Sequence, residues 1–140
     1  MSAVLATITA DPIDPARLEA LVRHPAAGAT VAFTGVVRDH DAGRQVVALY
    51  YEAHPDAQVV LADLLTAWLA DHPKVYQAGV THREGMLAVG EVALCVAVCA
   101  SHRSEAFAAC ADLVDTVKRS LPVWKRQHFA DGATRWAGVP

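Results

Sequence analysis

Two lysines, Lys118 and Lys125, are the side chains whose type and spacing most clearly suggest chemistry. The chain of 140 residues contains only three lysines, and these two flank Pro122. Proline lacks a backbone N–H and restricts the residue before it, so Pro122 is predicted to end a helix. Lys118 then lies in the last helical turn and Lys125 on the outgoing segment, where the two ammonium groups could converge. The alternative is a solvated helix end, at which cations favour the helix dipole.

Three further segments carry cations that could join the two lysines. Arg38 ends a predicted strand, His102–Arg103 starts the predicted helix, and Arg126 follows Lys125. A helix start favours anions because of its free N–H groups and its dipole, and arginine adds a bidentate donor. The cluster therefore predicts a phosphorylated small molecule as ligand. For His102–Arg103 taken alone, the alternative is a surface corner that binds nothing.

The elements that must position these side chains are a mixture of strands and helices. Hydrophobic periodicity predicts strands over residues 4–9, 29–38, 46–52, 75–82 and 91–100, and helices from residue 15, over 56–69 and over 105–121. Asp14 is the expected N-cap of the first helix, Gly35 is expected to mark a bulge, and residues 39–43 are expected to form a mobile loop. Hairpin-like neighbours in this order favour an α+β fold over a doubly wound sheet.

The last predicted helix carries Lys118. Ser101 is the expected N-cap, and the buried stripe is predicted to contain Phe107, Cys110, Val114 and Leu121. Lys118 borders this stripe, so its aliphatic stem can pack on the protein while the amine points into a cleft.

Composition predicts one domain over residues 1–140 and excludes several classes of protein. The longest apolar run, Val92 to Ala100, is too short to span a bilayer, and the N-terminus lacks a basic leader, so a cytoplasmic location is expected. The net charge of −3 argues against general nucleic-acid binding, which needs a broad basic surface. Motifs of nucleophile-elbow hydrolases, P-loop kinases, zinc proteases and dinucleotide-binding enzymes do not occur.

The cysteines and the isolated histidines are interpreted as structural residues rather than as metal ligands. The three cysteines have no metal-ligand spacing and are interpreted as small buried hydrophobes: Cys95, Cys99 and Cys110. Four isolated histidines are interpreted as surface or core-edge residues: His24, His54, His72 and His82. No metal site is predicted.

Several segments, in this order, resemble the large, catalytic subunit of molybdopterin synthase. The main ones are Phe33–His40, Leu49–His54, Ala100–Phe107, and Lys118 with Pro122–Arg126. Two more, His82–Gly85 and Gly132–Trp136, are also similar to segments of that family. The likeness runs from about residue 30 to residue 136.

This resemblance implies a sulfurtransferase that converts cyclic pyranopterin monophosphate into molybdopterin by installing two dithiolene sulfurs. Sulfur would arrive as a thiocarboxylate on the C-terminal Gly-Gly tail of a small ubiquitin-like carrier subunit. The resemblance also implies a homodimer at the centre of a heterotetramer, with no cofactor. The fold that it implies is α+β, of α/β-hammerhead type, with an antiparallel sheet and packed helices.

The same resemblance implies roles for individual residues. Lys118 and Lys125 would be catalytic and would also bind substrate, since an ammonium can stabilise a developing oxyanion. Further substrate contacts would come from Val36, Val37, Arg38, His102, Arg103, Arg126 and Gln127.

Two departures from the family leave other hypotheses open. Gln127 stands where the family usually has glutamate, and the chain stops at Pro140, where some relatives have a longer tail. A non-catalytic homologue that still binds the carrier is therefore the second hypothesis. An unrelated phosphate-ligand enzyme built around Arg103 is the third.

Overall fold

The computed structural model describes residues 5–137. In chain order the elements are β1 (Leu5–Thr9), α1 (Pro15–Val22), β2 (Ala29–Val36), β3 (His40–Asp41), β4 (Arg44–Ala53), α2 (Ala57–Ala70), β5 (Val75–Arg83), β6 (Gly85–Ala88), β7 (Val92–Ala100), α3 (Arg103–Ser120), β8 (Val123–Phe129) and β9 (Thr134–Ala137). The predicted α+β fold is confirmed.

The first sheet has the strand order β1-β5-β7-β2. The predicted pairing of β5 with β7 is confirmed as antiparallel, with Val80 opposite Val96. The outer strand β1 departs from the predicted antiparallel sheet because it pairs with β5 in parallel. The bulge expected at Gly35 is present, since the register between β2 and β7 shifts between Gly35 and Val36.

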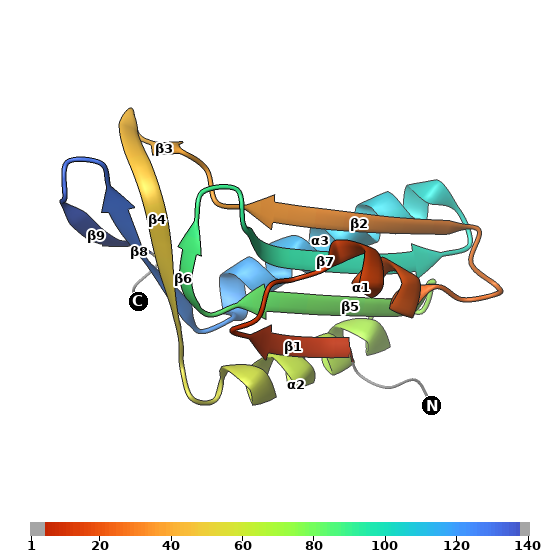
Figure 1. The fold of residues 1–140 in the computed structure, drawn as a ribbon. Coiled ribbons are helices and arrows are strands. Elements are labelled where there is room, and N and C mark those ends of the chain that lie inside the picture. The colour runs from red at the N-terminus through yellow and green to blue at the C-terminus, as the bar shows by residue number, and fades with distance from the viewer. Residues whose placement is uncertain (1–4, 138–140) are drawn as a thin grey trace.

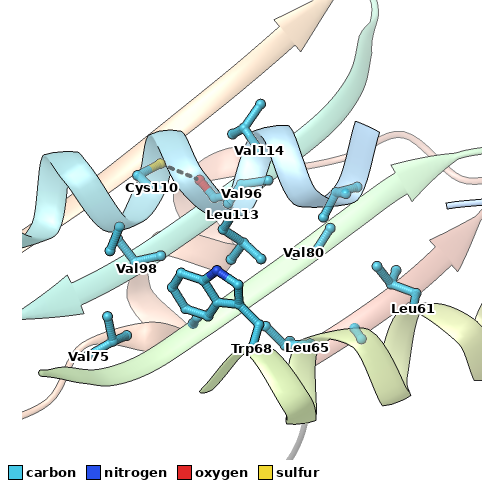
Figure 2. Close-up of a cluster of buried hydrophobic side chains, with 14 of the residues drawn as sticks. Leu61, Leu65, Trp68, Val75, Val80, Val96, Val98, Cys110, Leu113 and Val114 are labelled. Atoms are coloured by element: carbon cyan, nitrogen blue, oxygen red, sulfur yellow. Dashed lines mark hydrogen bonds between the residues drawn. The ribbon is translucent and has the colours of Figure 1, made fainter. Parts of the chain in front are cut away.

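Helices cover both faces of the first sheet because β7 is apolar on both sides. Alternate residues of a strand point to opposite faces, so Val96 and Val98 pack with α2 and α3, while Cys95 and Ala97 pack with α1. Figure 2 shows the larger cluster, in which Leu113 of α3 packs among side chains of α2 and the sheet. Burying a leucine of this kind contributes about 1.5–3 kcal/mol.

A polar contact also joins the two large helices. The Trp68 indole Nε1 donates a hydrogen bond of 2.8 Å to Asp112 Oδ2 on α3. The His72 ring stacks on Trp68, and its Nε2 lies 3.3 Å from the same carboxylate oxygen.

The cysteines are buried, as predicted. No helix within residues 5–137 is long and apolar enough to cross a membrane.

The second sheet is built around β4, which pairs with β3, β6 and β8, while β9 pairs with β8. Its strands run across the ends of the first sheet's strands (Figure 1), which agrees with the expected hammerhead-type arrangement. In the β4–β8 pair, Leu49 lies opposite Gln127 and Tyr51 opposite Lys125. This register brings pocket residues of the two strands onto one face.

Local pattern did not predict three parts of the second sheet. The segment after Pro122 forms β8 and β9, and the 85–90 connection contains β6, which pairs with β4. The expected loop at 39–43 contains β3, joined to β4 through Ala42 and Gly43, both with positive φ. Two positive φ values are typical of a tight hairpin turn. The strands β6 and β8 were missed because their partner β4 is distant in sequence, and β3 and β9 because they are very short themselves.

The start of α3 also differs from the sequence expectation. His102, not Ser101, occupies the N-cap position, and the His102 N–H donates to Glu105 Oε2 at 3.2 Å. The Ser101 hydroxyl instead pairs with the Tyr76 hydroxyl. Phe107 is 63% exposed, so its predicted place in the buried stripe was wrong. The stripe is formed by Ala106, Ala109, Cys110, Leu113, Val114 and Val117.

Candidate functional site

A pocket of about 490 Å³ lies where the second sheet meets the C-terminal end of α3. Its apolar wall includes Phe33 of β2, Leu94 of β7 and Leu121 just after α3. Its polar wall comes from the β3 hairpin, β4, β5, α3 and β8. Segments that are far apart in the sequence therefore meet at one cavity.

Both lysines line this pocket. Lys118 occupies the last turn of α3, as predicted, and is exposed. Lys125 is half-buried on β8 and shares its face with Val123 and Gln127 by strand alternation. The pKa of Lys125 is lowered, first by burial and then by the positive charge of Lys118. The lysines are thus close enough to repel each other, an arrangement that attracts an anion.

Arg38, Asp41 and Gln127 form a polar network at the same pocket. Asp41 Oδ1 lies 3.4 Å from Arg38 Nη2, and Asp41 Oδ2 accepts a hydrogen bond of 2.7 Å from Gln127 Nε2. The bond from Gln127 is the main cause of the lowered pKa of Asp41. Gln127 is buried, and its Oε1 has no partner within residues 5–137.

Tyr51 and His82 also line the pocket, although sequence reasoning did not place them there. Their rings meet edge to face with centroids 5.1 Å apart. Burial raises the pKa of Tyr51, so the phenol keeps its proton. The available signal for Tyr51 was its period-two spacing from Leu49, and for His82 its place in the family-like segment that ends at Gly85. His40 and Asp41 were missed because their segment was predicted to be a loop.

Three other residues that were predicted to contact the substrate have side chains that point in different directions. Val36 lines the pocket and is half exposed. Val37 is buried in the core of the second sheet, where its N–H donates to the Glu91 carbonyl and its carbonyl accepts from Gly90. Arg126 points to the other face of β8, where its guanidinium bonds to Thr134 and lies 5.9 Å from the Trp136 ring.

His102 and Arg103 lie at the opposite end of α3 from Lys118. Fifteen residues separate Arg103 from Lys118, and at a rise of 1.5 Å per residue this amounts to about 22 Å. Neither residue lines the pocket. A single chain therefore brings Val36, Arg38, Lys118, Lys125 and Gln127 of the predicted site residues to the pocket. The others do not line it: Val37, His102, Arg103 and Arg126.

The pocket is suited to an anionic ligand of small-molecule size. Three cationic side chains line it, and a volume of several hundred Å³ is typical of small-molecule sites. Within residues 5–137, no group of three or more His, Cys, Asp or Glu residues is arranged to hold a metal ion. An α+β fold with paired lysines in a half-apolar cavity is the arrangement expected of an enzyme that acts on an anionic small molecule.

Comparison with known proteins specifies this class further. The MoaE protein family matches residues 8–120. A molybdopterin synthase catalytic subunit from Nostoc sp. is 37% identical over 137 residues, covering 94% of this chain and 81% of the relative. The chain belongs to the MoaE family.

Solved structures agree with this assignment. A crystal structure of molybdopterin synthase from Staphylococcus aureus matches with a TM-score of 0.85 and 29% identity, covering 94% of this chain and 96% of that one. A Helicobacter pylori chain matches with a TM-score of 0.68 and 19% identity, covering 96% and 91%. The latter structure is a complex of subunits 1 and 2 of molybdopterin-converting factor, and at this identity it supports the fold alone.

Proposed function

We propose that this protein is the catalytic subunit of a molybdopterin synthase and transfers sulfur to cyclic pyranopterin monophosphate. The observation that carries the proposal is the convergence of Lys118 and Lys125 in one pocket of a MoaE-family chain. These lysines come from different elements, α3 and β8, and β8 is held at the pocket by its pairing with β4. We take residues 1–140 to act as one domain in the cytoplasm.

The charges of the pocket support an anionic substrate. Arg38 lies at its rim, 65% exposed, and can meet a phosphate with a bidentate donor. The apolar wall around Phe33 and Leu94 can cover a flat ring system. Gln127 lines the same pocket and holds Asp41 beside Arg38 through the hydrogen bond from its Nε2.

The lysines support acyl–sulfur chemistry. We propose that a small subunit with a C-terminal Gly-Gly thiocarboxylate places this group in the pocket. The Helicobacter pylori chain of the same fold is likewise found in a complex with a second subunit. An ammonium beside the carbonyl stabilises the oxyanion that forms when the carbonyl carbon is attacked. We assign this role first to Lys118 and second to Lys125.

A second copy of the chain is needed if His102 and Arg103 bind substrate. The length of α3 keeps these residues about 22 Å from Lys118 in one chain. We propose a homodimer at the centre of a heterotetramer, in which His102 and Arg103 of one copy reach the pocket of the other.

Replacement of Lys118 tests the proposed function. Purified protein, thiocarboxylated small subunit and cyclic pyranopterin monophosphate are combined, and dithiolene product is measured. Lys118→Ala should reduce turnover by at least about 100-fold, the scale of losing one oxyanion donor. The third lysine, Lys74, is exposed and does not line the pocket, so Lys74→Ala is the matched control and should retain full activity.

A second candidate function is supported by Gln127, which stands where the resemblance leads us to expect glutamate. The chain would then be a homologue that binds the small subunit without producing molybdopterin. Tight binding of the small subunit with no dithiolene product from the unmodified protein would favour this candidate. Product from the unmodified protein and from Lys118→Ala alike would contradict the assigned role of Lys118.

A further inference from the structure

His82 is the one histidine of β5, and its ring is held in a single orientation at the pocket. His82 lies opposite Leu94 of β7, so both side chains point to the face of the first sheet that α3 covers. Its Nδ1 lies 2.6 Å from the Arg83 carbonyl oxygen, and Tyr51 contacts the ring edge to face. Backbone and aromatic contacts thus fix the direction of the second ring nitrogen.

The hydrogen bond to Arg83 also determines which nitrogen carries the proton. A carbonyl oxygen can only accept, so Nδ1 must donate, and in the neutral ring Nε2 is left with its lone pair. Within residues 5–137, Nε2 has no hydrogen-bond partner. It is also not fully buried, unlike Arg83 Nε and Gln127 Oε1, which are the side-chain atoms there that are buried without a partner. Since His82 lines the pocket, we take Nε2 as the proton acceptor that it offers there.

The surroundings favour the neutral form of this ring. The pKa of His82 is lowered by burial, and the positive charge of Lys118 lowers it further, while the bond to Arg83 opposes the shift. The charged or titratable groups that share the pocket come from five parts of the chain: Arg38, His40 and Asp41, Tyr51, Lys118, and Lys125. Most of the charge they bring is positive, which also disfavours the imidazolium form.

Sulfur transfer from a thiocarboxylate requires such an acceptor. Once the sulfur has bonded to the substrate carbon, it still carries the acyl group of the small subunit as a thioester. Release needs a water oxygen to bond to the carbonyl carbon and the carbon–sulfur bond to break. The electron pair leaves on sulfur as a thiolate. Of the two water protons, one must be accepted as the oxygen attacks, and the other stays on the carboxylic acid of the departing small subunit until it ionises to solvent.

We propose that His82 Nε2 accepts the proton of the water that hydrolyses this thioester, while Lys118 stabilises the oxyanion. This inference rests on the proposed sulfur-transfer function. It assigns His82 to one step, release of the small subunit, and leaves substrate binding to the cations. No oxidant, reductant or metal enters the balance of this step.

His82→Gln tests the assignment, because a neutral amide can fill the site without accepting a proton. The variant should lose 10²- to 10⁴-fold in kcat, the usual range for a general base, with little change in affinity for pterin or small subunit. In a single turnover, mass spectrometry should find the small subunit joined covalently to the pterin. His24→Gln is the control, since His24 lies outside the pocket and should leave turnover unchanged.

The pH profile separates a proton acceptor from a structural residue. The acceptor works only as neutral imidazole, so the unmodified protein should lose activity as pH falls through the lowered pKa of His82, below about 6.5. This acid limb should vanish in His82→Gln, while an alkaline limb from Lys125 should remain. Near-normal turnover in a folded variant, or slow turnover with the acid limb intact and no adduct, would overturn the proposal.

Two further results keep the test decisive. If His82→Gln does not fold, His82→Ala with imidazole in the buffer replaces it, and restored turnover on adding imidazole supports the proposal. Wild-type turnover by a folded His82→Ala protein without imidazole overturns it. If the unmodified protein forms neither product nor adduct, it is the proposed sulfur-transfer function that fails, and the two failures are therefore distinguishable.

Discussion

At the scale of single residues, the hydrogen bond between Asp41 and Gln127 joins the β3 hairpin to β8 at the pocket. Gln127 is buried and donates to Asp41, which also pairs with Arg38. One amide thus orients a carboxylate that in turn orients a cation. A glutamate at position 127 would place two carboxylates side by side, so in this chain the amide is a structural requirement of the network.

We therefore predict that Gln127→Glu destabilises the protein by about 1–3 kcal/mol, the cost of an unsatisfied or repelled buried polar group. Repulsion raises the pKa of one carboxyl of the pair above its unfolded value, so stability is retained at low pH and lost as pH rises through that raised pKa. Chemical denaturation of both proteins at about pH 5 and about pH 8 measures this difference.

A complementary substitution provides the control. In the double variant Asp41→Asn with Gln127→Glu, the asparagine amide can donate to the glutamate, so the hydrogen bond returns with its direction reversed. Most of the lost stability should return. A double variant no more stable than Gln127→Glu alone would show that these side chains do not meet in solution.

At the scale of elements, the approach of α1 to the first sheet depends on a missing side chain. A Cβ added at Gly79 would lie 2.7 Å from Leu18 Cδ1 and 3.1 Å from Leu5 Cβ. Both neighbours belong to elements that pack directly on β5. Glycine at this position therefore allows α1 to lie close to the sheet. The position of α1 in turn affects its packing on β7.

We predict that Gly79→Ala lowers the free energy of unfolding by about 1–3 kcal/mol, because the added methyl overpacks a buried contact. Leu18→Ala alone should cost about 2–5 kcal/mol through the cavity that it leaves. Since the new methyl fills part of that cavity, the double variant should cost less than the two single variants added together. Strictly additive costs, measured by denaturant unfolding, would contradict the predicted contact.

At the scale of the whole molecule, α3 separates two groups of cations that the proposed function requires together. Lys118 lies at the pocket, while His102 and Arg103 lie about 22 Å away at the other end of the helix. A homodimer resolves this separation if each pocket is completed by the helix start of the other copy. The arrangement can be tested without a structure of the assembly.

We predict that mixing Lys118→Ala with Arg103→Ala restores activity that neither variant has alone. In a mixed dimer, one pocket combines the intact lysine of one copy with the intact arginine of the other. Random exchange makes half of the dimers mixed, so about one quarter of the wild-type activity should return. Subunit exchange is verified by mass spectrometry of the dimers, and no gain despite verified exchange would place His102 and Arg103 outside the pocket.

The sequence by itself determined the α+β class, the main helices and central strands, the cap at Asp14 and the bulge at Gly35. These features depend on local causes, namely periodicity, capping and backbone freedom. The ordered segments also identified the family and the two lysines. Gln127 and Arg38 were likewise identified, because each belongs to or adjoins one of those segments.

Only the tertiary structure decided which of these side chains meet. Whether Lys125 faces the pocket and Arg126 faces away depends on the register of β8 against β4, a pairing across more than seventy residues. The role proposed for His82 depends on its contact with Tyr51, a contact between two strands in different sheets. Long-range contacts of this kind leave no local periodicity, so the sequence indicated which residues were present, and the fold decided which of them share the pocket.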